Sequence, residues 1–189
     1  MNVKDMLRQA SDAAKQLITL SDQTIIGILK ETAQVLRTHT EEVLAANRQD
    51  LERMDPANPK YDRLKLTEER LQGIAADMEN VSTLPSPLNK VLSETTRPNG
   101  MVIRKVTVPF GVIGVIYEAR PNVTFDVFSL CFRSGNVCVL KGGSDADFSN
   151  RALVRIIHSV LERQGINPAV CTLLPPDREA TCLLYTSPS

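Results

Sequence analysis

The 189-residue sequence lacks an excess of charge of either sign. It contains 22 lysine and arginine residues and 22 aspartate and glutamate residues, so its formal net charge is zero at neutral pH. A protein that binds nucleic acid or an anionic membrane surface by electrostatic attraction needs a basic excess. We therefore expect small molecules or other proteins as partners, and neither nucleic acid nor a membrane.

Long hydrophobic segments are also missing. Residues 1–6 carry charge early and lack the apolar core and small-residue cleavage site of a secretory signal. The longest apolar run, residues 108–117, contains two glycines and has about half the length of a membrane-spanning helix. We expect this run to form a buried strand, and we expect a cytoplasmic protein.

Paired metal-ligand motifs are absent as well. The four cysteines show no C-x-x-C spacing, and the two histidines lie far from them in the sequence. Metal binding is therefore not expected. Cys131, Cys138 and Cys171 each lie in an apolar segment, which is typical of small core residues in a reducing compartment.

The amino-terminal residues show helical periodicity. Apolar residues at steps of three and four predict a first helix over about residues 6–20. Ser21 is a plausible N-cap for a second, long helix that ends near Met54. A third helix is predicted to begin at Thr67 and to end near Ser82, before two prolines.

The pattern then changes to strands. Residues 91–96 and 101–108 are predicted to form a fairly polar hairpin around the Arg-Pro-Asn-Gly turn at residues 97–100.

Beyond the hairpin, buried strands alternate with helices. Strands are predicted at residues 112–117, 137–140 and 169–173, with helices at about 123–133 and 145–164 between them. The apolar face that the second of these helices turns toward the sheet consists of Phe148, Ala152, Ile156 and Val160. The sequence therefore predicts an α/β fold with an amino-terminal helical layer and part of a doubly wound parallel nucleotide-binding sheet.

Ligands of such sheets bind beyond the carboxyl ends of the strands, which here are followed by residues 118–123 and 141–145. Neither segment contains G-x-G-x-x-G, so a standard Rossmann dehydrogenase is disfavoured.

The second of these segments reads Lys141-Gly142-Gly143-Ser144. A lysine at a strand end, followed by glycines and a helix start, could bind an anion such as a ribose phosphate. The alternative is a solvated lysine, a simple turn, and Ser144 as the cap of the next helix.

Asn122, in the first segment, also allows two interpretations. It could cap the helix that follows. Its amide could instead donate to an oxygen that becomes negative during acyl transfer.

Several motifs together resemble one family. Residues 109–124 read PFGVIGVIYEARPNVT, and Arg-Pro-Asn-Gly at 97–100, Ser-Gly-Asn at 134–136 and Lys-Gly-Gly-Ser at 141–144 surround them in the same order. Over about residues 3–180 the sequence is similar to gamma-glutamyl phosphate reductases, which belong to the aldehyde dehydrogenase superfamily.

This resemblance implies NADPH-dependent reduction of L-glutamyl 5-phosphate to L-glutamate 5-semialdehyde, with release of phosphate, in proline biosynthesis. A cysteine thiolate attacks the acyl phosphate in that family, and Asn122 matches the asparagine that donates to the oxyanion. A homo-oligomer is implied for the full-length protein, with glutamate 5-kinase as a candidate partner.

The resemblance also assigns the cofactor turn. Lys141 matches the lysine beside the adenosine ribose, within the turn that includes Gly142 and Gly143. Ser144 stands where NAD-preferring relatives often have a glutamate, and the loss of that charge favours NADP(H).

Arg120 has no equivalent in ordinary aldehyde dehydrogenases, and we expect it to attract the phosphate or carboxylate of the substrate. The alternative is a local ion pair with Glu118 or Asp126.

The chain is expected to divide into a helical part of the cofactor-binding domain (1–86), a hairpin resembling the oligomerisation arm (87–108), a partial NADP-binding region (109–180) and a tail unlike the family (181–189). Cys182, in that tail, is not expected to be the nucleophile.

The nucleophilic cysteine is then missing, and the chain is expected to be inactive alone. Two alternatives are a noncatalytic nucleotide-binding or interaction fragment and an aldehyde dehydrogenase relative with another substrate.

Overall fold

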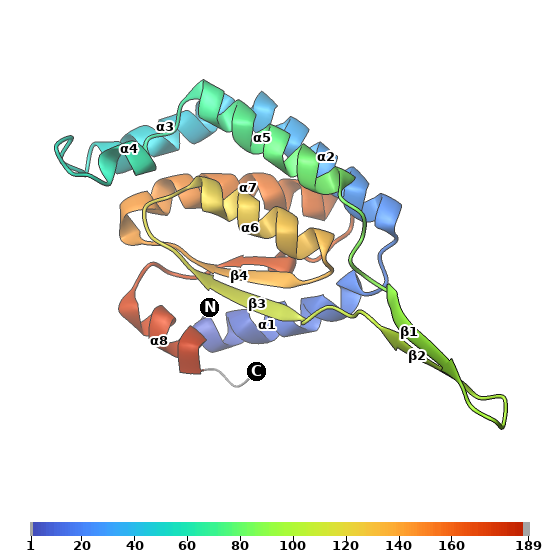
Figure 1. The fold of residues 1–189 in the computed structure, drawn as a ribbon. Coiled ribbons are helices and arrows are strands. Elements are labelled where there is room, and N and C mark those ends of the chain that lie inside the picture. Colours follow the sequence, from blue (N-terminus) through green and yellow to red (C-terminus); the bar gives the residue numbers. More distant parts are fainter. Residues whose placement is uncertain (1, 187–189) are drawn as a thin grey trace.

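Helices and a small parallel sheet form the body of the molecule, from which one hairpin projects (Figure 1). The computed structural model describes residues 2–186. The helices are α1 (Val3–Leu17), α2 (Asp22–Thr38), α3 (Thr40–Leu51), α4 (Tyr61–Leu64), α5 (Glu68–Thr83), α6 (Asn122–Arg133), α7 (Asp147–Arg163) and α8 (Arg178–Thr186). The strands are β1 (Val91–Thr96), β2 (Val102–Val106), β3 (Val112–Ile116), β4 (Val137–Lys141) and β5 (Cys171–Leu173), and the short 3₁₀ helices are η1 (Ser144–Ala146) and η2 (Pro168–Val170).

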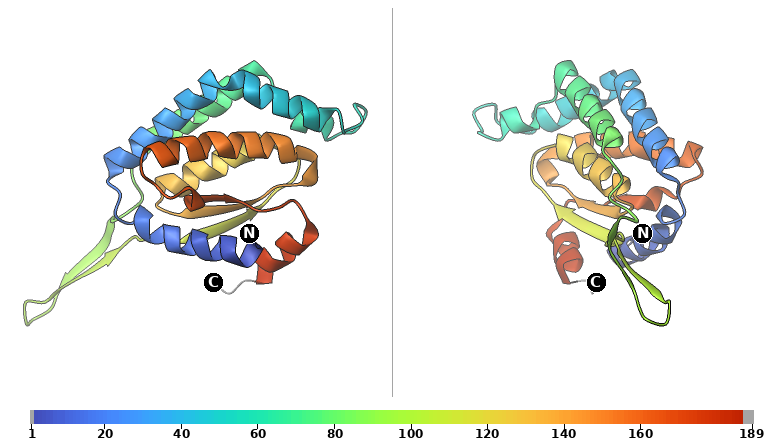
Figure 2. Two further views of the ribbon diagram at one scale, coloured as in Figure 1. Left: turned by 180° about the vertical axis from the view of Figure 1, so that it is seen from behind. Right: turned by 45° about the vertical axis from the view of Figure 1, so that its right-hand side comes forward.

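The layers follow from the order of these elements. The sheet β3-β4-β5 is parallel, and the crossover helices α6 and α7 cover one of its faces. Helices α1 and α8 lie on the opposite face, while α2, α3 and α5 form an outer layer over α6 and α7 (Figure 2). The predicted fold class, a helical layer joined to part of a parallel α/β sheet, is confirmed.

Local capping signals fixed two helix starts as predicted. The Ser21 side chain accepts a hydrogen bond from the Thr24 amide, and the Thr67 side chain accepts one from the Arg70 amide. The prediction of one long second helix is wrong, because His39 separates α2 from α3 with φ of −111°. The hydroxyl of Thr38 donates to the Val35 carbonyl there, a type of side-chain bond that competes with helix continuation.

The expectation that residues 108–117 form a buried strand is wrong, because Val112 and Ile116 of β3 are exposed. Burial is most complete in the central strand, β4. Val137, Cys138, Val139 and Leu140 have no exposed surface, as expected for a strand covered on both faces. The third strand of the sheet is shorter than predicted. It begins at Cys171, because Pro168 starts a 3₁₀ turn that the Asn167 side chain caps.

Helix α7 confirms most of its predicted apolar face. Ala152, Ile156 and Val160 are buried, but Phe148 is 38% exposed. The prediction that Phe148 faces the sheet is wrong: the Arg53 guanidinium lies 5.5 Å from the centre of its ring.

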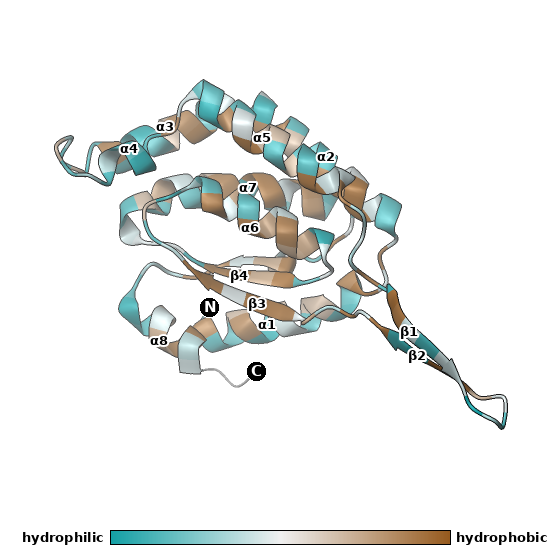
Figure 3. Cartoon of the chain, viewed as in Figure 1, coloured by the Kyte–Doolittle hydropathy of each residue, from teal (hydrophilic) through white to brown (hydrophobic). Residues whose placement is uncertain are grey.

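Strands β1 and β2 pair antiparallel and leave the body of the molecule as a hairpin, as predicted. All of their residues are exposed. The expectation of a fairly polar hairpin is only half right, because hydrophobic stretches lie next to hydrophilic ones along it (Figure 3). The exposed apolar side chains of these strands are Val91, Leu92, Val102, Ile103 and Val106.

The three core cysteines lie where the sequence predicted. Cys131, Cys138 and Cys171 are buried and unpaired, and burial raises the pKa of Cys131 to about 12.

The tail expected at residues 181–189 begins within α8, and residues 187–189 lie outside the described residues. No described helix is long and apolar enough to cross a membrane. Residues 2–186 contain no cluster of three metal-ligating side chains.

Candidate functional site

Strands β3 and β4 end side by side at one edge of the sheet. Ile116 pairs with Lys141 in the parallel register, and the Tyr117 amide donates to the Lys141 carbonyl over 3.1 Å. A Cβ built on Gly143 would lie 3.7 Å from the Glu118 Cα. The two predicted segments therefore meet as adjacent turns.

Lys141 lies inside the molecule, with 8% of its surface exposed. Its Nζ donates to the carbonyl oxygens of Gly142, at 3.1 Å, and Pro176, at 3.2 Å. Across residues 2–186 it forms no ion pair with a carboxylate. The alternative of a solvated lysine is therefore wrong, because carbonyl oxygens of the chain, and no carboxylate among the described residues, face the Lys141 Nζ.

The turn after Lys141 has room only for glycine at its first position as long as the Asn150 side chain keeps its place. A Cβ on Gly142 would lie 2.3 Å from Nδ2 of Asn150, which is far inside van der Waals contact. Gly143 has no comparable restriction, since its nearest neighbours would be at ordinary contact distance. Gly142 thus serves internal packing, whereas Gly143 leaves its backbone open to a ligand.

Ser144 is exposed and opens η1, and it does not cap α7. That cap comes from Asp50, whose carboxylate accepts from the amides of Phe148 at 3.1 Å and Ser149 at 2.8 Å. The alternative role of Ser144 as the helix cap is wrong. Burial raises the pKa of Asp50, and the hydrogen bonds from Ser149 and Phe148 oppose that shift.

Asn122 is the first residue of α6, where Pro121 holds the cap position and no side chain caps the helix. The amide is half-buried, and its Nδ2 donates to Oδ2 of Asp126 over 2.9 Å. The cap interpretation of Asn122 is therefore wrong. Burial raises the pKa of Asp126, as does the negative charge of Asp77, while the bond from Asn122 lowers it.

The Arg120 side chain is exposed next to this helix start. Glu118 pairs instead with Lys60, at 3.3 Å, and Asp126 accepts from Asn122. In the described part of the chain the Arg120 guanidinium has no ion pair, so the alternative of a local pair with Glu118 or Asp126 is wrong.

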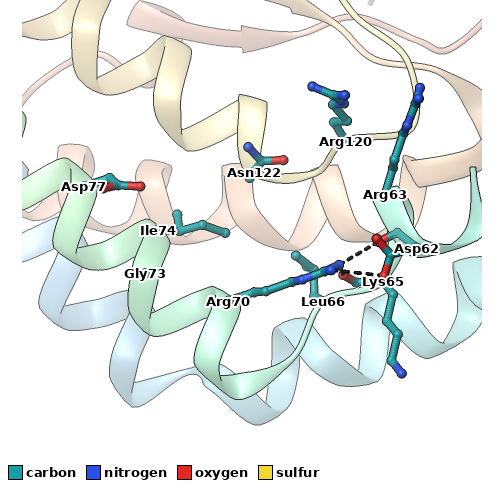
Figure 4. A pocket seen from close by; sticks show the side chains of 10 residues that line it. All are labelled: Asp62, Arg63, Lys65, Leu66, Arg70, Gly73, Ile74, Asp77, Arg120 and Asn122. Carbon is teal, nitrogen blue, oxygen red and sulfur yellow. Dashed lines mark hydrogen bonds and ion pairs between the residues drawn. The ribbon is translucent and has the colours of Figure 1, made fainter.

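Arg120 and Asn122 line one cavity of about 360 Å³ between α6 and the α4–α5 segment (Figure 4). The opposite wall carries charged residues that the sequence analysis missed, namely Asp62, Arg63, Lys65, Arg70 and Asp77. Arg70 is held by Asp62, at 3.1 Å, which leaves Arg63, Lys65 and Arg120 as cations without an ion pair among the described residues. No sequence signal pointed to this wall, because only the packing of α5 against α6 brings it to the cavity.

The structure thus separates the predicted site residues into two groups. Arg120 and Asn122 line the cavity, while Lys141, Gly142, Gly143 and Ser144 form the neighbouring turn and do not line it. A mixed-charge cavity with a free amide donor suits a small anionic acyl compound. The buried ammonium and the open glycine backbone suit a phosphate-bearing ligand.

The chain has relatives among known sequences and among solved structures. No family model matches the chain. Over 184 residues, 97% of the chain, it is 98% identical to a gamma-glutamyl phosphate reductase from Parabacteroides distasonis and spans 44% of that protein's length. It therefore spans less than half the length of this curated relative.

Solved structures include the same enzyme family. A gamma-glutamyl phosphate reductase from Thermotoga maritima superposes with a TM-score of 0.91 at 30% identity, over 98% of this chain and 45% of that one. A NAD-dependent benzaldehyde dehydrogenase from Corynebacterium glutamicum gives a TM-score of 0.71 at 18% identity, over 94% of this chain and 37% of that one, and shares the fold.

Proposed function

Since this chain belongs to the gamma-glutamyl phosphate reductase family, we propose that it forms part of an enzyme that reduces L-glutamyl 5-phosphate with NADPH. The products are L-glutamate 5-semialdehyde, phosphate and NADP⁺. The observation that carries the proposal is that Arg120 and Asn122 line one cavity beside the Lys141–Ser144 turn. An anion-binding guanidinium, an amide donor and a cofactor turn then adjoin at one edge of the sheet.

Asn122 stabilises the oxygen that becomes negative when a thiolate attacks the acyl carbon. An asparagine amide has two N–H donors. The Asp126 carboxylate takes one of them and fixes the orientation of the group. The second N–H is left for the oxyanion, as preorganised stabilisation requires.

Arg120 binds the phosphate or the α-carboxylate of the substrate. The guanidinium is exposed at the cavity and has no ion pair among residues 2–186, so no bond within the described chain has to break before it binds.

The turn formed by Lys141, Gly142, Gly143 and Ser144 holds the adenosine ribose and its 2'-phosphate, and bound NADPH supplies the hydride. The buried Lys141 ammonium lacks a carboxylate partner in the described structure, and the open backbone of Gly143 admits a close approach. Ser144 brings no negative charge, which favours NADP over NAD.

The nucleophilic cysteine comes from sequence that this chain does not span. Cys131 and Cys138 are buried, with pKa values raised above the ordinary thiol range, so neither provides a thiolate.

We also propose that the enzyme is cytoplasmic and that it is a homo-oligomer that uses the hairpin region 87–108 for assembly. Glutamate 5-kinase is a candidate partner, because an acyl phosphate hydrolyses readily and gains from direct transfer.

The test uses a full-length reductase that carries residues 2–180 of this chain. Replacing Arg120 with Ala should raise KM for the acyl phosphate about tenfold or more, because a charged hydrogen-bond partner is lost. Arg155→Ala is the matched control, since Arg155 is an exposed arginine paired with Glu42 on another face. An Arg120→Ala enzyme with unchanged KM would remove Arg120 from the site.

The reverse reaction tells the two anionic groups apart. A raised KM for inorganic phosphate assigns Arg120 to the phosphate, whereas a raised KM for the semialdehyde assigns it to the α-carboxylate.

A further inference from the structure

A chain of two hydrogen bonds, one partly and one fully buried, connects the residues behind the two turns. Tyr117 Oη lies 2.7 Å from Thr124 Oγ1, and Thr124 Oγ1 donates to Asn150 Oδ1 over 3.1 Å. Burial raises the pKa of Tyr117, so its hydroxyl keeps its proton. Because the Thr124 proton is used toward Asn150, the Tyr117 hydroxyl is the donor to Thr124.

These bonds fix the orientation of the Asn150 amide. Its Oδ1 faces Thr124, which places Nδ2 on the other side, against Gly142. Asn150 is 1% exposed and cannot move aside into solvent. The backbone of Gly142 therefore rests on a side chain whose position Thr124 determines.

Thr124 also lies near Asn122, the proposed donor to the acyl oxygen. It lies in the first turn of α6, two residues after Asn122. Tyr117 directly follows β3 and precedes the turn that carries Arg120. One set of three polar side chains, from the residue after β3 and from α6 and α7, thus connects the two groups of site residues.

We propose that Thr124 and Asn150 are positioning residues that hold the Lys141–Ser144 turn at a fixed place relative to Asn122. This inference rests on the proposed function, in which the cofactor binds at the turn and the acyl group binds at Asn122. Neither residue touches a ligand. Their contribution is the relative placement of hydride donor and acyl carbon.

Three variants of a full-length reductase that carries residues 2–180 of this chain test the proposal. Thr124→Val keeps the side-chain shape and removes the hydroxyl, while Thr124→Ser keeps the hydroxyl. Thr32→Val is the control, because Thr32 is also fully buried but bonds only the Ile28 carbonyl within α2. NADPH dissociation constants from cofactor fluorescence and kcat at saturating substrate are measured for each variant.

Thr124→Val should weaken NADPH binding about five- to tenfold, the effect of one buried hydrogen bond, and should also lower kcat. Thr124→Ser and Thr32→Val should retain the unaltered values. If Thr124→Val binds NADPH as Thr32→Val does, the inference is overturned. An unaltered protein that binds no NADPH would instead overturn the proposed function.

A double-mutant cycle gives an independent test. Gly142→Ala places a methyl group against Asn150 and should weaken NADPH binding, whereas Asn150→Ala makes room for that methyl group. The double variant should therefore bind NADPH more tightly than the product of the two single effects predicts. Independent, multiplicative effects would show that Asn150 does not position the turn.

Discussion

The parallel sheet and the projecting hairpin are built from similar strand-forming residues, yet they are held in place differently. Val137–Leu140 of β4 have no exposed surface and lie between helices, whereas β1 and β2 are exposed along their whole length. Within the described residues the hairpin depends on its backbone ladder, the turn bonds of Arg97 and an exposed Glu94–Arg104 pair. Strand propensity is thus common to both, and burial separates them.

This comparison predicts the largest loss of stability for a substitution in α6, which covers one face of the sheet. Phe128→Ala should lower the free energy of unfolding by about 3–5 kcal/mol, because the ring is fully buried and leaves a cavity. Leu130→Ala on the same helix is the control, since Leu130 is 54% exposed, and it should change stability by less than about 0.5 kcal/mol. Urea unfolding measures both. Equal losses would refute burial as the distinguishing factor.

A smaller effect is expected where the sheet meets the turn. Gly142→Ala should destabilise the fold by about 1–3 kcal/mol, the usual cost of overpacking, because its methyl group meets Asn150. The control is Gly27→Ala in α2, where nothing lies within 4 Å of the added carbon and alanine should stabilise the helix. Thermal unfolding compares them. A neutral Gly142→Ala would show that Asn150 yields easily.

The buried cap of α7 should respond to pH. Burial raises the folded-state pKa of Asp50 above the ordinary value of 3.8, so the folded state binds the proton more tightly than the unfolded state. The stability of the unaltered protein relative to Asp50→Asn should therefore be highest below that value. It should fall as pH rises through the folded-state pKa.

Urea unfolding between about pH 3 and 8 tests this slope. Glu52→Gln is the control, because Glu52 is an exposed carboxyl at the C-cap of α3, the helix that carries Asp50. Its replacement should leave the slope that Asp50 causes in place. A difference for Asp50→Asn that grows in the opposite direction would mean that the hydrogen bonds from Phe148 and Ser149 outweigh burial.

The smallest effect should come from the hairpin. Ile103→Thr keeps β-branching, and Ile103 is exposed, so the change should alter stability by less than about 0.5 kcal/mol. Unfolding is measured at two protein concentrations. A larger loss that depends on concentration would show that another chain covers this surface in solution.

Local signals in the sequence predicted the elements, and contacts between distant residues decided what the sequence could not show. Ser21 and Thr67 were recognised as caps because each bonds an amide three residues away. For α7 the sequence offers Ser144 as one possible cap, because no local pattern reveals that Asp50 reaches that helix from 99 residues away.

The candidate site divides in the same way. Arg120, Asn122 and Lys141 were predicted to share one edge, because parallel strands end together. Arg63 was missed, since it reaches the cavity only through the packing of the outer helical layer. The sequence also predicts too long a second helix, because the apolar pattern continues across His39 whereas the helical conformation of the backbone is interrupted there.

The close packing of Asn150 against Gly142 has a consequence for how these two positions evolve. A β-carbon at position 142 can be accepted only if the side chain at position 150 is shortened or turned away. The two positions should therefore change together during evolution, and a lineage that loses the glycine first passes through a less fit intermediate. Gly143, one residue further along, is under no such joint restriction from the described chain, so its history should record the demands of the ligand that we propose for this turn.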